Sequence, residues 1–184
     1  MSGGMVILVV LVVVFLVAVI LKARGEPAFL FPYKKVNALF TPAERSFYGV
    51  LIQAIGDDFV AFGKVRVADV LVASDALNPK SRRAAFNRIS AKHFDFVLCA
   101  PSDLTVLCVI ELNDRSHSKQ RRAERDEFLE SACRIAGLPL ITFPTQAAYT
   151  VDEIANKIAL TISTFQGANE RRKGLPRQLR IEPK

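Results

Sequence analysis

Two short apolar runs of the sequence each contain one carboxylate. The first run covers residues 94–99 and contains Asp95, and the second covers residues 106–111 and ends at Glu111. The segment between them, Ala-Pro-Ser-Asp at residues 100–103, is typical of a turn, because proline fixes φ and serine and aspartate bond to their own backbone. The pattern therefore predicts a β-hairpin, and a turn centred on this segment would place Asp95 opposite Glu111.

Such a pair of carboxylates has a chemical consequence. Directly opposed side chains on one face of a hairpin lie about 5 Å apart, and like charges at that distance repel. A divalent cation is the obvious partner, because it favours the ionised form of both groups. The alternative is that Asp95 and Glu111 are two strand-end residues that each meet solvent.

The N-terminal segment carries a separate signal. Residues 5–21 contain no polar side chain, and as a helix they would be about 25 Å long, close to the ~30 Å hydrocarbon core of a bilayer. Residues 1–4 contain no lysine or arginine, unlike the start of a signal peptide. We expect a transmembrane anchor over residues 5–22, with the N-terminus outside and the rest of the chain in the cytoplasm, because the cations follow the span: Lys22, Arg24, Lys34 and Lys35.

Charge and cysteine content limit the classes of binding partner and the cellular compartment. The formal net charge is +7, and residues 167–184 contribute +4 of it from six cations and two carboxylates. Nucleic acid and anionic lipid head groups are the two anionic partners that such a chain suggests. The basic tail would contact anionic lipid in one interpretation and be a solvated, disordered end in the other. The odd number of cysteines without framework spacing predicts small buried side chains in a reducing compartment, at Cys99, Cys108 and Cys133.

The remaining pattern predicts a single domain over residues 41–166, after a linker at 23–40 and before the tail at 167–184. Helices and strands alternate along this domain, which favours an α/β fold with a mixed central sheet flanked by helices on both sides. A capping box of Thr41 and Glu44, with Pro42 at the first helical position, opens its first helix. The expected elements that follow begin with residues 59–62 and 65–72, as two strands or as one bent strand. After them we expect a short helix at 82–89, the hairpin, a helix at 119–136, a strand at 138–143 and a helix from Thr150.

Several of these motifs together resemble a known superfamily. They are Thr-Pro-Ala-Glu-Arg at 41–45, Asp95-Phe96, Glu111-x-x-Asp-x-x-His117, and the Arg125-Asp126 helix that ends in Gly-Leu-Pro-Leu-Ile. The combination resembles the PD-(D/E)XK, or restriction-endonuclease-like, superfamily, in the branch related to very-short-patch-repair endonucleases. Within it, the chain most resembles a bacterial domain-of-unknown-function family, number 2726, over roughly residues 40–145.

The resemblance implies roles for individual residues. Asp95 and Glu111 would bind Mg²⁺ or Mn²⁺, with the Leu112 carbonyl as a third ligand, and the ion would activate water against a phosphodiester. Glu44 occupies the position of a further supporting acid, although its place in a capping box already accounts for it. His117 matches the acid/base or phosphate-contacting histidine, whereas a histidine in a polar loop can also be a simple surface residue.

One departure from the superfamily pattern concerns catalysis. The lysine two residues after the second carboxylate is Asn113 here, which can donate a hydrogen bond but carries no charge. Lys92 or Lys119 could supply a cation instead. Two groups of cations flank the carboxylates in the sequence. They would suit the phosphates of a nucleic-acid backbone, or they are two charged faces exposed to solvent. The groups are Arg82, Arg83, Arg88 and Lys92 before the carboxylates, and Lys119, Arg121, Arg122 and Arg125 after them.

These expectations combine into a membrane-anchored, cytoplasm-facing nuclease-like protein in the bacterial inner membrane. Its expected substrate is nucleic acid, and DNA in particular. An inactive module that binds nucleic acid or a partner protein is the first alternative, motivated by Asn113. A membrane scaffold whose tail holds lipid head groups is the second.

Overall fold

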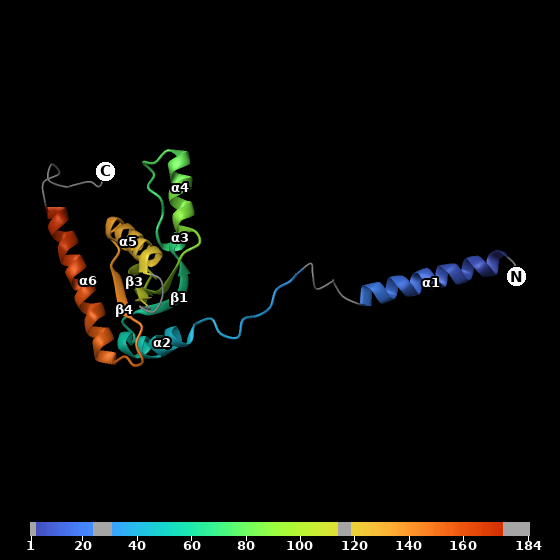
Figure 1. Ribbon diagram of the computed structural model, residues 1–184, viewed down its shortest axis with the longest axis horizontal. Helices are drawn as coiled ribbons and strands as arrows, with labels where there is room; N and C mark the ends of the chain where they lie inside the picture. The colour runs from blue at the N-terminus through green and yellow to red at the C-terminus, as the bar shows by residue number, and fades with distance from the viewer. Residues whose placement is uncertain (1–2, 24–30, 114–118, 175–184) are drawn as a thin grey trace. The chain divides into compact units, whose positions relative to one another are not determined.

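The computed structural model describes residues 3–23, 31–113 and 119–174 of the chain (Figure 1). The described chain divides into two units, Met1–Leu39 and Phe40–Lys184, which we treat separately. The first unit contains helix α1, Gly3–Ala23, whose apolar side chains are all exposed within the structure. By length and composition α1 could cross a membrane, as the sequence predicts.

A four-stranded mixed sheet forms the centre of the second unit. Its strands are β1 (Val60–Arg66), β2 (His93–Cys99), β3 (Val106–Asn113) and β4 (Leu140–Pro144), and they lie in the order β1-β2-β3-β4. The first three strands are antiparallel neighbours, and β4 runs parallel to β3. The mixed α/β architecture predicted from the sequence is therefore confirmed.

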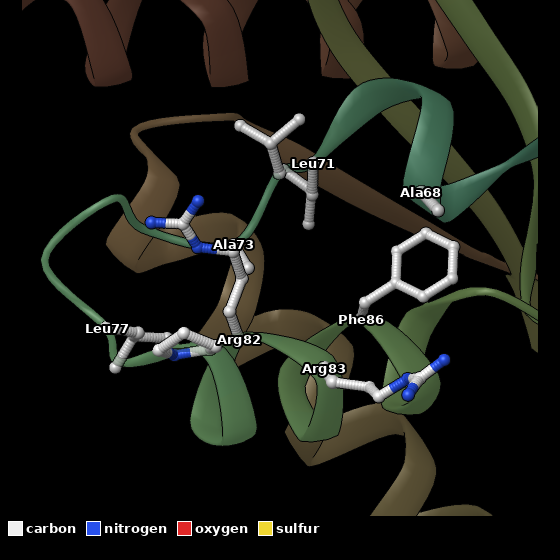
Figure 2. A pocket seen from close by; sticks show the side chains of 9 residues that line it. Ala68, Leu71, Ala73, Leu77, Arg82, Arg83 and Phe86 are labelled. Atoms are coloured by element: carbon white, nitrogen blue, oxygen red, sulfur yellow. The ribbon is translucent and has the colours of Figure 1, made fainter.

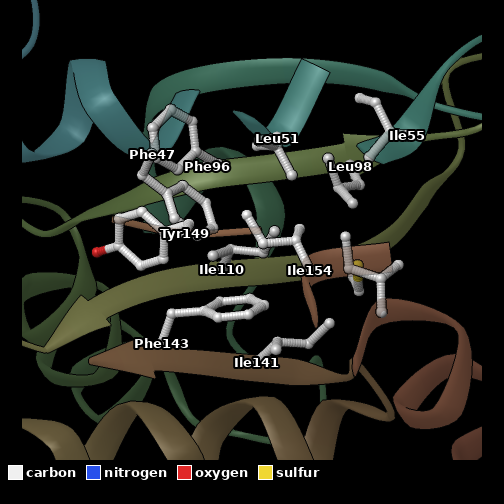
Figure 3. Packing of buried hydrophobic residues seen from close by; sticks show 12 residues of the cluster. Phe47, Leu51, Ile55, Phe96, Leu98, Ile110, Ile141, Phe143, Tyr149 and Ile154 are labelled. Carbon is white, nitrogen blue, oxygen red and sulfur yellow. The ribbon is translucent and has the colours of Figure 1, made fainter. Parts of the chain in front are cut away.

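One face of the sheet is covered by α2 (Pro42–Ile55) and α6 (Val151–Gly174). The capping box predicted at the start of α2 is present, with the Thr41 side chain and the Glu44 carboxylate each accepting the other residue's backbone N–H. Aromatic rings fill this core, and Figure 3 shows them between the helices and the strands. Helix α6 reaches Gly174, so it includes the first residues of the segment expected to be a tail.

The opposite face packs against α5 (Lys119–Ala136) and two shorter helices, α3 (Val67–Val70) and α4 (Pro79–Ile89). Helix α3 corrects the expected strand at 65–72, because the chain leaves β1 after Arg66 and coils into one helical turn. Helix α4 begins three residues earlier than expected, since Asn78 caps it through a hydrogen bond from the Ser81 N–H.

The three cysteines lie within these cores and are buried, as predicted: Cys99, Cys108 and Cys133.

Candidate functional site at one end of the sheet

The register of the hairpin brings the two predicted carboxylates to facing positions. The last pair of the β2–β3 ladder is Phe96 with Ile110, and the next position along the same register holds Asp95 and Glu111. Side chains alternate between the faces of a sheet, and Val109 belongs to the core beneath α5. Glu111 therefore belongs to that same face, at the end of the sheet where β2 begins and β3 ends. At Asp95 the alternation of β2 is interrupted, because Phe94 belongs to the core beneath α5 and Phe96 to the core beneath α2.

The contacts of Asp95 explain why the ladder stops beside it. Strand β3 continues to pair with β4 as far as Asn113, three positions beyond Ile110, the last residue of β3 that pairs with β2. The Leu112 N–H donates to Asp95 Oδ2 across 2.8 Å. The aspartate side chain thus takes the place of a strand partner, which fixes one carboxylate oxygen and leaves Oδ1 directed elsewhere.

Glu111 lies in a drier setting on the neighbouring strand. The residue is half-buried, and its Oε1 atom is inaccessible to solvent. Burial raises the pKa of the Cys133 thiol on α5 to about 12, and the negative charge of Glu111 adds to that shift. The Glu111 carboxylate therefore sits close to α5, where a low local dielectric strengthens its interaction with any cation.

A lysine from the edge strand completes the row. Lys64 lies between the pairs Gly63–Phe96 and Val65–Phe94 of the β1–β2 register, and so stands opposite Asp95. Its Nζ is 3.6 Å from Asp95 Oδ1 and 2.5 Å from Glu44 Oε1. Lys64 has a φ of 56°, in the left-handed region that costs a residue with a Cβ roughly 1 kcal/mol, so these contacts hold a strained backbone.

The neighbouring glycine explains how α2 comes so close to β1. A Cβ on Gly63 would lie 2.2 Å from Cζ of Phe40, whose ring occupies that space. The Phe40 ring also packs against Phe96, with 5.4 Å between centroids. Phe40 immediately precedes the N-cap Thr41. The contact of the Phe40 ring with Gly63 therefore brings the first turn of α2, which contains Glu44, against the edge of the sheet.

Glu44 uses both of its carboxylate oxygens within this arrangement. Oε2 accepts the Thr41 N–H at 2.9 Å and Oε1 accepts from Lys64. Burial opposes ionisation of the carboxyl, but the hydrogen bond from Lys64 and those from Thr41 outweigh it and hold the pKa of Glu44 below its ordinary value. Glu44 therefore acts in this structure as the group that positions Lys64.

Lys64 is the member of the site that sequence reasoning missed. Lys92 and Lys119 were the candidates for a cation, yet the Lys92 Nζ lies 5.9 Å from the ring centre of Phe128. A usable signal was present, because a glycine inside a strand marks a close backbone approach, and Gly63 directly precedes Lys64, the first of the two charges on β1.

The predicted nucleic-acid-binding cations separate into two groups. Arg88 stacks over the Phe128 ring at 4.1 Å, on the same ring as Lys92. Arg82 and Arg83 instead line a cleft between α3 and α4. His117 lies outside the described residues, and so do the side chains of four cations on α5, Lys119, Arg121, Arg122 and Arg125.

The donor set suits a hard divalent ion in composition. Mg²⁺ is commonly held by one or two carboxylates, with water and substrate phosphate as the other ligands. Asp95 and Glu111 are such a pair. Within the part of the chain that the structure describes, no three histidine, cysteine or acidic side chains are grouped closely enough to hold a metal ion. Glu44 as a further metal ligand stays a prediction.

Comparison with known proteins gives one match. No curated protein and no solved structure matches the chain. The family model described as "Protein of unknown function (DUF2726)" matches residues 36–162, which cover the sheet, α2 to α5 and the row from Lys64 to Glu111. Since this match spans more than half of the sequence, the chain belongs to the DUF2726 family.

Proposed function

We propose that the domain is a metal-dependent nuclease of the restriction-endonuclease-like type, tethered by α1 to the cytoplasmic face of a bacterial inner membrane. The observation that carries the proposal is the row across the sheet: Glu111 follows the last β2–β3 pair in the register position of Asp95, and the Lys64 Nζ lies 3.6 Å from Asp95 Oδ1. Two carboxylates and one cation on neighbouring strands match the needs of phosphodiester hydrolysis. The basic character of the chain supports nucleic acid as the substrate.

Each side chain in the row has a distinct task in this proposal. A bound divalent ion supplies Lewis-acid polarisation of the phosphate and lowers the pKa of water. Asp95 and Glu111 hold that ion, and Leu112 orients Asp95 through its N–H. Lys64 provides the positive charge beside the phosphate that Asn113 lacks, and Glu44 keeps its ammonium group in place. His117 retains the acid/base role that the resemblance implies.

The cations around Phe128 support a path for the substrate. Arg88 and Lys92 follow one another on the chain just before β2, and Lys92 is three residues from Asp95. A phosphate backbone that contacts them would pass the carboxylates with its next phosphates in reach. These residues position the substrate, because contacts to phosphates carry no sequence information.

The test uses the full chain in detergent micelles with fluorophore-labelled single- and double-stranded DNA and RNA, with Mg²⁺, with Mn²⁺ and with chelator. We expect cleavage that needs the metal and disappears in Asp95→Asn and Glu111→Gln. Asp57→Asn, in the exposed turn after α2, is the matched control and should cleave normally. Cleavage that survives both site variants would overturn the proposal.

Lys64 is tested separately by its charge. Lys64→Met should slow cleavage by about 10²-fold, as expected for loss of one preorganised charge at the reacting phosphate. Lys64→Arg should recover part of the rate, since it restores the charge. Equal rates for Lys64→Met and the unchanged protein would remove Lys64 from the mechanism while leaving the metal site intact.

The alternative function is a nuclease-fold module that binds nucleic acid, or a partner protein, without cutting it. Asn113 and the ion pair between Lys64 and Asp95 favour it, since Lys64 offsets part of the charge available to a metal. In that case duplex DNA should bind with a steep salt dependence, without turnover and without any response to Mg²⁺ or Mn²⁺. The same titration with and without metal distinguishes the two functions.

A further inference from the structure

A cleft of about 670 Å³ lies between α3 and α4, beside the loop that joins them. Figure 2 shows Phe86 on α4 beneath Ala68 of α3, and Arg82 reaching from α4 toward the loop near Ala73. The lining is mainly apolar, with two arginines among aliphatic and aromatic side chains. None of the residues proposed for the nuclease site lines this cleft, apart from the two arginines that the sequence assigned to nucleic acid.

Three large apolar side chains are exposed on or beside this cleft. Val72 is 88% exposed, Phe86 is 46% exposed and Leu77 is 38% exposed. Helix α4 packs poorly on the domain, because Ile89 is its one buried side chain in the described structure. Apolar residues gathered on an exposed element usually mark a surface that another molecule covers.

The charges on α4 have one sign. Helix α4 contains Lys80, Arg82, Arg83 and Arg88 and no acidic residue. Asp75 in the loop engages Arg82, whose guanidinium donates to the Asp75 carbonyl at 2.9 Å and lies 3.5 Å from its carboxylate. Among the described residues, Lys80 and Arg83 make no ion pair, so their charges remain available to an anionic partner.

We propose that this surface docks on an anionic phospholipid leaflet, with Val72, Leu77 and Phe86 inserted among the lipids and Lys80 and Arg83 against the head groups. Exposed apolar side chains interleaved with cations are typical of interfacial membrane binding. Nucleic acid would use the cations, but it offers no partner for the aliphatic side chains of Val72 and Leu77.

Helix α1 makes such a weak contact effective. The segment 24–39 spans at most about 55 Å even when fully extended, so a membrane-inserted α1 would keep the domain near the bilayer. Tethering converts the second contact into an intramolecular event at high effective concentration. A few inserted side chains then suffice to hold the domain on the leaflet.

The experiment places an environment-sensitive fluorophore in the cleft. The three native cysteines are at most 4% exposed, so a Val72→Cys variant of the full chain can be labelled selectively with a nitrobenzoxadiazole maleimide. The labelled protein is reconstituted into vesicles of phosphatidylcholine alone or with 30 mol% phosphatidylglycerol. We expect a blue-shifted emission with at least a twofold gain in the anionic vesicles, and loss of that gain in a Lys80→Glu, Arg83→Glu background.

A second label position controls for general proximity to the membrane. Leu160→Cys, on α6, replaces a side chain that is 68% exposed, and it should show equal emission in both kinds of vesicle. Circular dichroism shows whether each variant is folded. Equal emission of the Val72 label in both vesicles, a gain that survives charge reversal, or a response only when duplex DNA is added would overturn the proposal.

Discussion

The end of the sheet around Asp95 and the cleft between α3 and α4 contrast in how their charges are held. At the sheet end, backbone N–H groups of Leu112 and Thr41 hold the Asp95 and Glu44 carboxylates, and Lys64 is shared between the two. At the cleft, Arg83 and Phe86 are exposed on α4, whose one buried side chain among the described residues is Ile89, and Val72 is exposed in the loop before it.

The difference indicates two kinds of task. Catalysis needs groups that are held at set distances before the substrate arrives. The sheet end meets this need, because Lys64 has a strained backbone and the carboxylates of its two neighbours, Glu44 and Asp95, each accept a hydrogen bond. Adhesion to a lipid surface needs exposed apolar area and mobile charge instead. The predictions below separate the two regions by how much a substitution in each lowers the free energy of unfolding.

Removal of a core ring should have the largest effect. Phe47→Ala deletes a fully buried ring that contacts Phe96, Phe143 and Tyr149, so we expect the free energy of unfolding to fall by about 3–5 kcal/mol. Phe86→Ala, at the cleft, should cost less than about 1 kcal/mol. Urea denaturation of the two variants measures both, and equal losses would show that α4 packs more tightly than described.

The substitution of Gly63 by alanine should cause the next largest loss of stability. Gly63→Ala places a Cβ in the space of the Phe40 ring, and the displacement of that ring from the edge of the sheet should destabilise the protein by about 1–3 kcal/mol. Gly49→Ala, in the middle of α2 with open space around it, should instead stabilise it by about 0.5–1 kcal/mol. Changes of the same sign in thermal denaturation would contradict the close approach of Phe40.

Neutralisation of Lys64 should alter the dependence of stability on pH. The pKa of Glu44 is lower in the folded than in the unfolded chain, so its contribution is fully present above pH ~4.5 and is lost as the pH falls through the folded value. Lys64→Met should lower stability by about 1–2 kcal/mol at neutral pH and by less at pH 3. Denaturation curves at both pH values measure the difference, and a loss independent of pH would separate Glu44 from Lys64.

The smallest effect should follow from charge reversal at the cleft. Arg83→Glu should change the free energy of unfolding by less than about 0.5 kcal/mol, because the side chain is exposed and makes no ion pair in the described residues. The same urea denaturation used for Phe86→Ala tests this, and a loss above about 1 kcal/mol would mean that Arg83 supports the fold.

Sequence reasoning predicted the local features well. The hairpin, the capping box at Thr41 and the helix at 119–136 each depend on residues close together in the chain, and all are confirmed. The expected strand at 65–72 was wrong beyond Arg66, because valines favour a strand while the chain there turns into α3. Periodicity alone cannot detect such a turn.

The contacts of the site could be predicted only in part. Asp95 and Glu111 face each other because a hairpin register follows from its turn. Lys64 escaped prediction because its place depends on a contact between two segments that are distant in the sequence: Phe40 with the cap of α2, and the Gly63 backbone. Nothing in local sequence spacing connects Glu44 to Lys64, and only the packed sheet edge does.

The most direct test of the central claim is isothermal calorimetry of the full chain in micelles with Mn²⁺ and with Mg²⁺. The account predicts one ion per chain, with affinity reduced at least tenfold in Asp95→Asn and in Glu111→Gln, and unchanged in Asp57→Asn. If neither site variant altered the binding, the two carboxylates would not share an ion, and the nuclease proposal would be contradicted.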